Sequence, residues 1–212
     1  EGRTVLIDAG DRGAEDRIIS YIKDQGISKI DVVIATHPHA DHIGGMADVL
    51  KTFEIGEIHM PRVMHTTKTF ENLLATIQSK GLKIKTAKAG VELDIDPNIK
   101  ATMVAPNSDE YDNLNDYSVV LKVSHGKNSF LLTGDAEKLS EKEILKNNHD
   151  ISADVLKVGH HGSSTSTTDE FLNKVNPKHA IILLGKDNSY GHPHREITDK
   201  LNAKGIKIYR TD

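Results

Sequence analysis

Four side chains that can bind metal ions occur within six residues of the sequence, namely His37, His39, Asp41 and His42. On an extended segment the first two histidines would point to the same face. A tight turn after them would bring Asp41 and His42 to a second ion. Imidazole and carboxylate ligands suit zinc, manganese and iron. Because solvated loop histidines rarely reach this density directly after an apolar strand, the segment predicts a two-metal site.

Two further groups also follow apolar segments. Asp135 could bridge two metal ions, or it could cap the helix that follows. His160 and His161 lie between two glycines, which favours close packing around an ion or a phosphate. The hydroxyl groups after this pair, including those of Ser163 and Ser164, could donate to phosphate oxygens, although helix capping and turn formation are favoured for them.

The last group lies in a loop that contains glycine and proline. His192 is a candidate metal ligand. Tyr190 could donate a hydrogen bond to a substrate or merely pack, and the sequence does not separate these alternatives. His194 could contact the substrate, or it could begin the last helix without a metal role. The remaining histidines have no partners in the sequence and are interpreted as surface or internally satisfied residues: His59, His65, His125, His149 and His179.

Composition limits the classes of protein to which the chain can belong. Its 212 residues suffice for one domain with a buried core, and the absence of cysteine excludes disulfides, zinc fingers and a thiol nucleophile. The net charge of −4 and the aromatic content of 4% weaken an interpretation as a general nucleic-acid-binding protein. No apolar run approaches the roughly 20 residues that span a bilayer, and no signal peptide is recognisable. Because the chain begins with Glu1, we expect a processed or excised piece.

Strands and helices alternate along the chain, which is expected to form one domain over residues 1–212. Strands are predicted at 4–7, 31–35, 57–60, 83–87, 100–105, 118–124, 129–132, 154–158, 179–184 and 207–209. Helices are predicted at 14–25, 43–53, 68–80, 137–147, 168–175 and 194–204. Residues 125–128 read as the turn of a hairpin. One hairpin within an alternating pattern predicts mixed sheets covered by helices rather than a purely parallel sheet.

Together, these motifs resemble the metallo-beta-lactamase superfamily. More closely, they are similar to the hydrolase domain of ComEC-type DNA-internalisation proteins and their stand-alone relatives. The resemblance covers nearly the whole chain and rests on Leu-Ile-Asp-Ala-Gly at 6–10, Thr-His-Pro-His-Ala-Asp-His-Ile-Gly-Gly at 36–45, Asn115 with Ser-Val-Val-Leu at 118–121, Leu-Leu-Thr-Gly-Asp at 131–135, Lys-Val-Gly-His-His-Gly-Ser at 157–163, Tyr-Gly-His-Pro-His at 190–194 and Tyr-Arg-Thr-Asp at 209–212. The first metal motif is specific to the superfamily, and the last three segments point to the ComEC-type branch.

The resemblance implies an α/β fold, a metallo-beta-lactamase-type αββα four-layer sandwich with mixed sheets and a metal site at one edge. It assigns ligands as follows: to the first ion His37, His39 and one histidine of the pair His160 and His161; to the second ion Asp41, His42 and His192; and to both, as a bridge, Asp135. Which histidine of the pair binds the metal stays open, and the other would face a substrate phosphate. Many members place a ligand histidine between the first motif and the bridging aspartate. Here the pair is expected to take that role, as in phosphorylcholine-esterase-like relatives. Such domains usually begin one strand earlier and continue further, so this chain is expected to be trimmed at both termini.

The activity implied by the resemblance is that of a phosphodiesterase or nuclease. Two divalent ions, zinc or manganese, would hold a bridging hydroxide, and Asp41 and His161 are candidates for assisting proton transfer. The substrate would be a phosphodiester such as DNA. The domain would lie outside the cytoplasm, either secreted or within a membrane-bound parent protein, and its oligomeric state is not set. The alternatives are a phosphorylcholine esterase, a lactonase, a thioesterase or a β-lactamase on the same fold, or a non-catalytic binding module. The β-lactamase alternative is weakened by the absence of cysteine.

Overall fold

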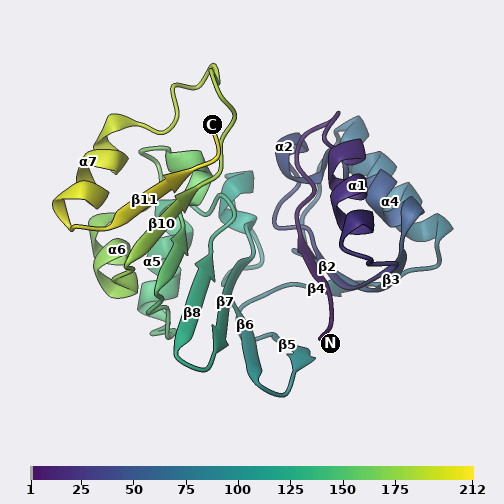
Figure 1. The fold of residues 1–212 in the computed structure, drawn as a ribbon, viewed down its shortest axis with the longest axis horizontal. Helices are drawn as coiled ribbons and strands as arrows, with labels where there is room; N and C mark the ends of the chain where they lie inside the picture. The colour runs from purple at the N-terminus through teal and green to yellow at the C-terminus, as the bar shows by residue number, and fades with distance from the viewer. Residues whose placement is uncertain (1) are drawn as a thin grey trace. The chain divides into compact units, whose positions relative to one another are not determined.

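The computed structural model describes residues 2–212, which form two compact units. Unit 1 runs to Ala87, and unit 2 runs from Lys88 to Asp212 (Figure 1). Each unit has its own sheet and its own hydrophobic core. No helix within residues 2–212 is long and apolar enough to cross a membrane.

Unit 1 contains four parallel strands in the order β1-β2-β3-β4. The strands are β1 (Val5–Ile7), β2 (Lys29–Ile34), β3 (Glu54–Met60) and β4 (Ile84–Thr86). The helices are α1 (Glu15–Asp24), α2 (Ala40–Ile43), α3 (Met46–Thr52) and α4 (Lys68–Ser79). Because all strands run in one direction, the loops after β1, β2 and β3 meet at the same edge of the sheet, where ligands of parallel sheets bind.

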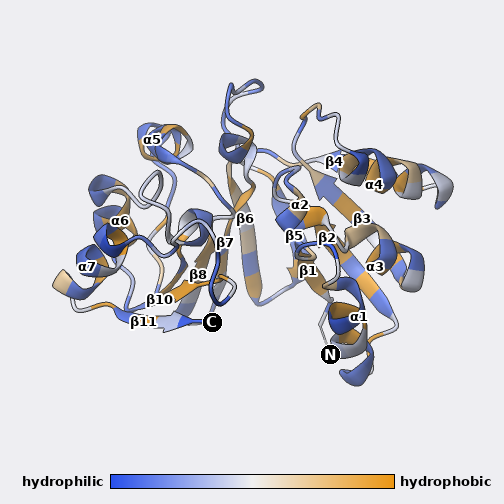
Figure 2. Ribbon diagram, turned by 90° about the horizontal axis from the view of Figure 1, so that it is seen from above, coloured by the Kyte–Doolittle hydropathy of each residue, from blue (hydrophilic) through white to orange (hydrophobic). Residues whose placement is uncertain are grey.

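Branched apolar side chains hold unit 1 together. Val33 of β2 and Ile58 of β3 are fully buried and share a cluster with Leu50 of α3 and Leu73 of α4. Figure 2 shows the orange of hydrophobic residues along the strands and bands of blue and orange along the helices. That banding is typical of helices with one buried face. The helices therefore pack on the sheet and fix the loops at its edge.

Unit 2 contains a mixed sheet of seven strands in the order β11-β10-β9-β8-β7-β6-β5. The strands are β5 (Glu92–Asp96), β6 (Ile99–Ala105), β7 (Val120–His125), β8 (Asn128–Leu132), β9 (Val155–Lys157), β10 (His179–Ile182) and β11 (Lys207–Arg210). Pairing is antiparallel from β5 to β8 and parallel from β8 to β11. The α-helices are α5 (Lys138–Lys146), α6 (Asp169–Val175) and α7 (Arg195–Ala203), and the short 3-10 helices are η1 (Leu114–Tyr117) and η2 (Gly159–Gly162).

The core of unit 2 lies between its sheet and the three α-helices. Leu131 of β8 and Leu156 of β9 are fully buried, in a cluster with Ile144 of α5, Phe171 of α6 and Leu201 of α7. Because β8, β9 and β10 are parallel, their carboxyl ends lie at one edge of the sheet. The loops that contain the second, third and fourth sequence motifs therefore begin at that edge.

One expectation from the sequence is wrong in detail, and one strand was not predicted. The helix predicted at 43–53 is two helices, α2 and α3, because the chain turns at Gly44, whose amide donates to the carbonyl of Gly10 at 2.8 Å. Strand β5 was not predicted, since its sequence Glu-Leu-Asp-Ile-Asp is acidic and it lies at the edge of the sheet. Edge strands tolerate such charges because one side faces solvent. The hairpin of β7 and β8 and the mixed sheet are confirmed.

A buried carboxylate fastens the segment that follows the histidine pair. Glu141 of α5 is 2% exposed and accepts hydrogen bonds from the amide of Thr167 and from the amide and hydroxyl of Thr168, the last at 2.7 Å. Thr168 in turn accepts from the amide of Phe171 and caps α6, although the sequence placed Thr168 within the helix and the capping hydroxyl before it. Burial raises the pKa of the Glu141 carboxyl above its usual value, against the lowering effect of these hydrogen bonds.

We expect Glu141→Ala to lower the free energy of unfolding by about 3 kcal/mol, because it leaves two amides and a hydroxyl without their acceptor in a buried place. Urea denaturation followed by circular dichroism measures this change. Glu170→Ala, at an exposed position of α6, is the matched control and should change the stability by less than about 0.5 kcal/mol. Equal stability of the two variants would contradict the assigned role.

Candidate metal centre

The first metal motif lies at the carboxyl end of β2, within unit 1. Nε2 of His37 and Nδ1 of His39 are 3.1 Å apart, and the two rings meet edge to face at 83°. Two imidazole nitrogens at about 2.05 Å from one tetrahedral zinc ion would be about 3.3 Å apart. The observed spacing therefore fits a shared ion as well as it fits a hydrogen bond.

Asp8 directly follows β1 and orients the motif through hydrogen bonds to Thr36 and His42. One carboxylate oxygen accepts from the amide of Thr36 at 2.8 Å, and the other accepts from the Thr36 hydroxyl at 2.8 Å and from Nδ1 of His42 at 2.7 Å. Because a carboxylate only accepts, Nδ1 of His42 must bear the proton. Nε2 of His42 therefore presents a lone pair, 3.6 Å from a carboxylate oxygen of Asp41.

The same network sets the tautomer of His37. The Thr36 hydroxyl uses its proton on Asp8, so it can only accept from Nδ1 of His37, 3.0 Å away. Nε2 of His37 then presents its lone pair towards His39. A carboxylate that fixes ligand histidines in this way is a usual outer partner of a bound metal.

Asp8 is a site residue that the sequence did not single out. Its backbone φ is 59°, a left-handed conformation that aspartate adopts more readily than most residues. Its position after the first strand, in Leu-Ile-Asp-Ala-Gly, was the available signal. His65, interpreted from the sequence as a surface or internally satisfied residue, lies in the loop after β3, and its ring centre is 6.4 Å from that of His39.

Two glycines let the loop after β1 approach the metal motif. A Cβ atom on Gly44 would lie 2.4 Å from the amide nitrogen of Arg12, and one on Gly45 would lie 2.7 Å from the carbonyl oxygen of Ala9. Contacts this short do not occur in proteins, so any side chain here would push the loop, and Asp8 with it, away from the histidines. The Gly-Gly pair that ends the motif thus serves packing.

In unit 2, Asp135 lies in the turn after β8 and is 2% exposed. Its amide donates to the Ser118 hydroxyl at 3.0 Å, and Nζ of Lys157 lies 3.8 Å from its carboxylate. The carboxylate of Asp116 accepts from the amides of Glu137 and Ser140 at the start of α5.

His160 and His161 both have left-handed backbones, with φ of 47° and 54°. Nδ1 of His161 contacts the carbonyl oxygen of Leu183 at 2.6 Å and must donate to it, so the lone pair of Nε2 faces a carboxylate oxygen of Asp135 at 3.2 Å. Two electron-rich atoms at this distance require a proton or a metal ion. Left-handed conformations cost about 1–3 kcal/mol each for residues with side chains, and such strain collects at functional sites.

The partners of His160 are different. Nδ1 of His160 lies 3.1 Å from a carboxylate oxygen of Glu137 and 3.1 Å from the Thr165 hydroxyl. Glu137 also accepts from the side-chain amide of Asn115 at 2.8 Å. The structure thus distinguishes the two histidines, since His161 is turned to Asp135 and His160 to Glu137.

The hydroxyl run after the pair mainly holds its own loop. The Ser163 hydroxyl contacts that of Thr165 at 3.0 Å, and the Ser166 hydroxyl donates to the carbonyl of Gly159 at 2.8 Å. The Ser164 amide donates to Nδ1 of His194 at 3.0 Å, which places the proton of a neutral His194 on Nε2. His194 also precedes α7 directly.

Glycine again permits close packing beside the pair. Gly162 has φ of 83°, and a Cβ atom there would lie 2.6 Å from Pro193. This contact brings the loop after β10 to the histidine pair, and the ring of His192 lies 5.6 Å from that of His160 and 6.4 Å from that of His161. Burial lowers the pKa of His192, and the neighbouring histidines lower it further, so its imidazole stays neutral and able to bind a metal at pH 7.

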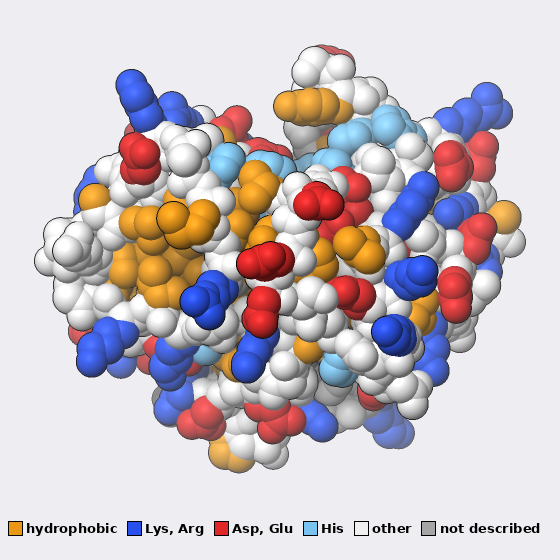
Figure 3. Space-filling model, turned by 180° about the vertical axis from the view of Figure 1, so that it is seen from behind, with side chains coloured by type: hydrophobic (Ala, Val, Ile, Leu, Met, Phe, Trp, Pro, Cys, Tyr) orange, Lys and Arg blue, Asp and Glu red, His pale blue; other side chains and the backbone are white. Residues whose placement is uncertain are grey.

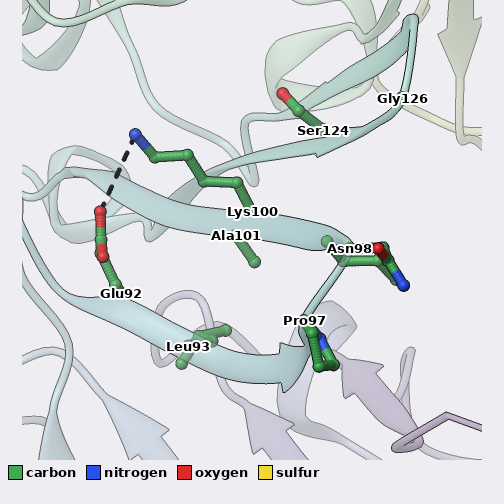
Figure 4. A pocket seen from close by; sticks show the side chains of 9 residues that line it. Glu92, Leu93, Pro97, Asn98, Lys100, Ala101, Ser124 and Gly126 are labelled. Atoms are coloured by element: carbon green, nitrogen blue, oxygen red, sulfur yellow. Dashed lines mark ion pairs between the residues drawn. The ribbon is translucent and has the colours of Figure 1, made fainter.

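A pocket of about 480 Å³ lies elsewhere in unit 2 (Figure 4). It is lined by residues of the β5–β6 hairpin and by Ser124 and Gly126 at the β7–β8 turn, with an ion pair between Glu92 and Lys100 at 4.0 Å. The turn is at the opposite end of β8 from Asp135. This pocket contains none of the candidate metal ligands and is a separate feature.

The sequence profile of the metallo-beta-lactamase superfamily matches residues 1–186. Together with the fold and the donor groups described above, this match shows that the chain belongs to the metallo-beta-lactamase superfamily. The predicted fold class is therefore confirmed. Members are typically hydrolases, and the imidazole and carboxylate donors of both units fit divalent metal ions.

Two curated relatives are similar over nearly the whole chain. ComE operon protein 3 of Bacillus subtilis is 36% identical over 93% of this chain and 25% of that protein. Recombination protein 2 of Haemophilus influenzae is 34% identical over 99% of this chain and 25% of that protein. The chain thus spans about a quarter of each relative. Among solved structures, Zn(2+)-bound PqqB from Methylobacterium extorquens has the same fold, with a TM-score of 0.58 and 11% identity over 98% of this chain and 81% of that chain.

The role of Asp8 leads to a prediction about metal affinity. Asparagine adopts the same left-handed backbone, but its amide group cannot accept from both the Thr36 hydroxyl and Nδ1 of His42. We expect Asp8→Asn to bind zinc about 10- to 100-fold more weakly with an unchanged fold. Competition with a chromophoric chelator measures the affinity.

Asp31→Asn is the matched control. Asp31 accepts from the amide of Thr4 at 2.9 Å in the same sheet and contacts none of the histidines. Its substitution should leave the zinc affinity at the wild-type value. An equal loss of affinity in the two variants would mean that Asp8 acts through the sheet and not through the histidines.

Proposed function

We propose that this chain is a phosphodiesterase or nuclease that works with two divalent ions, zinc or manganese. The observation that carries the proposal is the convergence of His37 Nε2 and His39 Nδ1 at 3.1 Å, with the tautomer of His37 fixed by the Thr36–Asp8 network. The proposed ligands follow from the family resemblance, and they are His37, His39, Asp41, His42, Asp135, His161 and His192.

The division of labour within the histidine pair follows from its contacts. We assign the ligand role to His161, because its Nε2 faces Asp135, and we assign His160 to the substrate phosphate. Glu137 holds the His160 ring through the 3.1 Å contact between its carboxylate and Nδ1. Asp41 is exposed and is assigned to proton transfer; that role for His161 stays a prediction.

When bound, the two ions supply a nucleophile at neutral pH by lowering the pKa of water, and they offset the charge that develops on the phosphoryl group. Three features support a phosphodiester over other substrates. The chain lacks the cysteine typical of many β-lactamases of this fold. The histidine pair offers a donor for phosphate. The similarity to Recombination protein 2 and ComE operon protein 3 supports DNA as the proposed substrate class.

We expect the zinc- or manganese-loaded protein to hydrolyse bis(p-nitrophenyl) phosphate, and we expect His39→Ala to lower kcat/KM at least about 1,000-fold. His125→Ala, at the exposed β7–β8 turn, is the matched control and should retain wild-type activity. Release of p-nitrophenol measures both. Equal activity of His39→Ala and wild type, or no activity with either metal, would contradict the proposal.

The same preparations should be assayed against a lactone, a thioester, a phosphorylcholine ester and a β-lactam. Faster hydrolysis of one of these would assign the site to another reaction of the same fold. Bound metal without any hydrolysis would favour the alternative of a non-catalytic binding module.

A further inference from the structure

An exposed aromatic ring lies next to the histidines of unit 2. Residues 183–194 join β10 to α7 and form a loop that projects from the unit, yellow-green in Figure 1. Tyr190 in this loop is 77% exposed, more than the 65% of Tyr21 on α1. In Figure 3 a projection rises at the top of the view, and pale blue histidine side chains lie at its base. An exposed tyrosine at such a place is a candidate contact for a ligand.

The rings of Tyr190, His192 and His161 are stacked one after another, and neighbouring rings are nearly parallel. Tyr190 and His192 have ring centres 5.6 Å apart and planes at 21°, and His192 and His161 have centres 6.4 Å apart and planes at 18°. His192 covers one face of the tyrosine, and the high exposure of Tyr190 leaves its other face to solvent. The column of rings therefore runs from the surface to His161, whose Nε2 faces Asp135.

One side chain closes the loop at its base. The amide group of Asn188 donates to the carbonyl of His192 at 2.7 Å and accepts from the backbone amide of His192 at 3.0 Å. It also donates to the carbonyl of Gly185 at 3.2 Å. Tyr190 lies within this closed segment. A ring that is already positioned loses less conformational entropy when a ligand packs on it.

We propose that Tyr190 is a stacking platform for an unpaired base of the substrate, so that the preferred substrate is single-stranded nucleic acid or a strand end. The proposal rests on the proposed phosphodiesterase function. Aromatic rings stack on every base, whereas paired bases in a duplex are already stacked on each other. The net charge of −4 provides no general attraction for a polyanion, so a base contact of this kind would add affinity to that of the proposed phosphate contacts.

The charges around the loop are consistent with binding through base stacking and not through electrostatic attraction. Lys186 and Arg195 lie near its two ends, while Asp187 offsets the charge of Lys186. Arg195 is 92% exposed at its side chain and lies 3.3 Å from Asp199. The loop therefore has little net charge of its own, and base stacking is its distinguishing feature.

The test uses metal-loaded protein and two fluorescein-labelled octamers with phosphorothioate linkages, one of thymidine and one of abasic residues. Fluorescence anisotropy gives both dissociation constants. We expect wild type to prefer the thymidine octamer by about 5- to 150-fold, the range that one stacked base supplies. Tyr190→Ala should lose this preference, Tyr190→Phe should keep it, and Tyr21→Ala should match wild type.

The outcomes separate this inference from the proposed function. No base preference in wild type, a preference that survives in Tyr190→Ala, or its loss in Tyr190→Phe would overturn the stacking role. Elemental analysis of Tyr190→Ala should give the wild-type metal content, and a lower content would also overturn it, because the loop would then act through the metal ligands. Hydrolysis of bis(p-nitrophenyl) phosphate by wild type tests the proposed function on its own.

Discussion

The hydrogen bonds of the Asp8 carboxylate are the interaction on which the metal motif of unit 1 depends. They hold Thr36 and His42 directly and His37 through the Thr36 hydroxyl. Each histidine then directs Nε2 away from the network as a lone pair. Without a fixed tautomer, an imidazole spends part of its time with a proton where the ligand electrons are needed. The parallel sheet serves this arrangement by ending β1 and β2 at the same edge.

In unit 2, a backbone carbonyl instead of a carboxylate sets the tautomer of a histidine. The carbonyl of Leu183 sets the tautomer of His161, and the left-handed turn at the histidine pair directs its Nε2 to Asp135. Neighbouring contacts stabilise the left-handed conformation of this turn. Gly162 allows contact with Pro193, and Glu141 fastens the segment that follows. In each unit, hydrogen bonds to a carboxylate or to a backbone carbonyl orient histidines that are proposed metal ligands.

The sequence predicted the α/β class, the family and the positions of the four motifs, because each motif directly follows a recognisable apolar strand. It did not predict the role of Asp8, since an aspartate after a strand is common and its partners are 28 and 34 residues away. It also left the roles of His160 and His161 open, because adjacent identical residues differ only in their tertiary contacts. It also missed the break at Gly44, where close packing against the loop after β1 overrides helical periodicity.

The proposed function depends most on the claim that the chain binds two divalent ions. Elemental analysis of zinc-loaded, desalted protein tests this claim most directly, with His39→Ala from unit 1 and Asp135→Asn from unit 2 measured beside wild type. We expect two ions per wild-type chain and a loss of bound metal in both variants, since His39 and Asp135 are both proposed ligands. A single ion in wild type, or an Asp135→Asn protein that retains the full wild-type content, would contradict it.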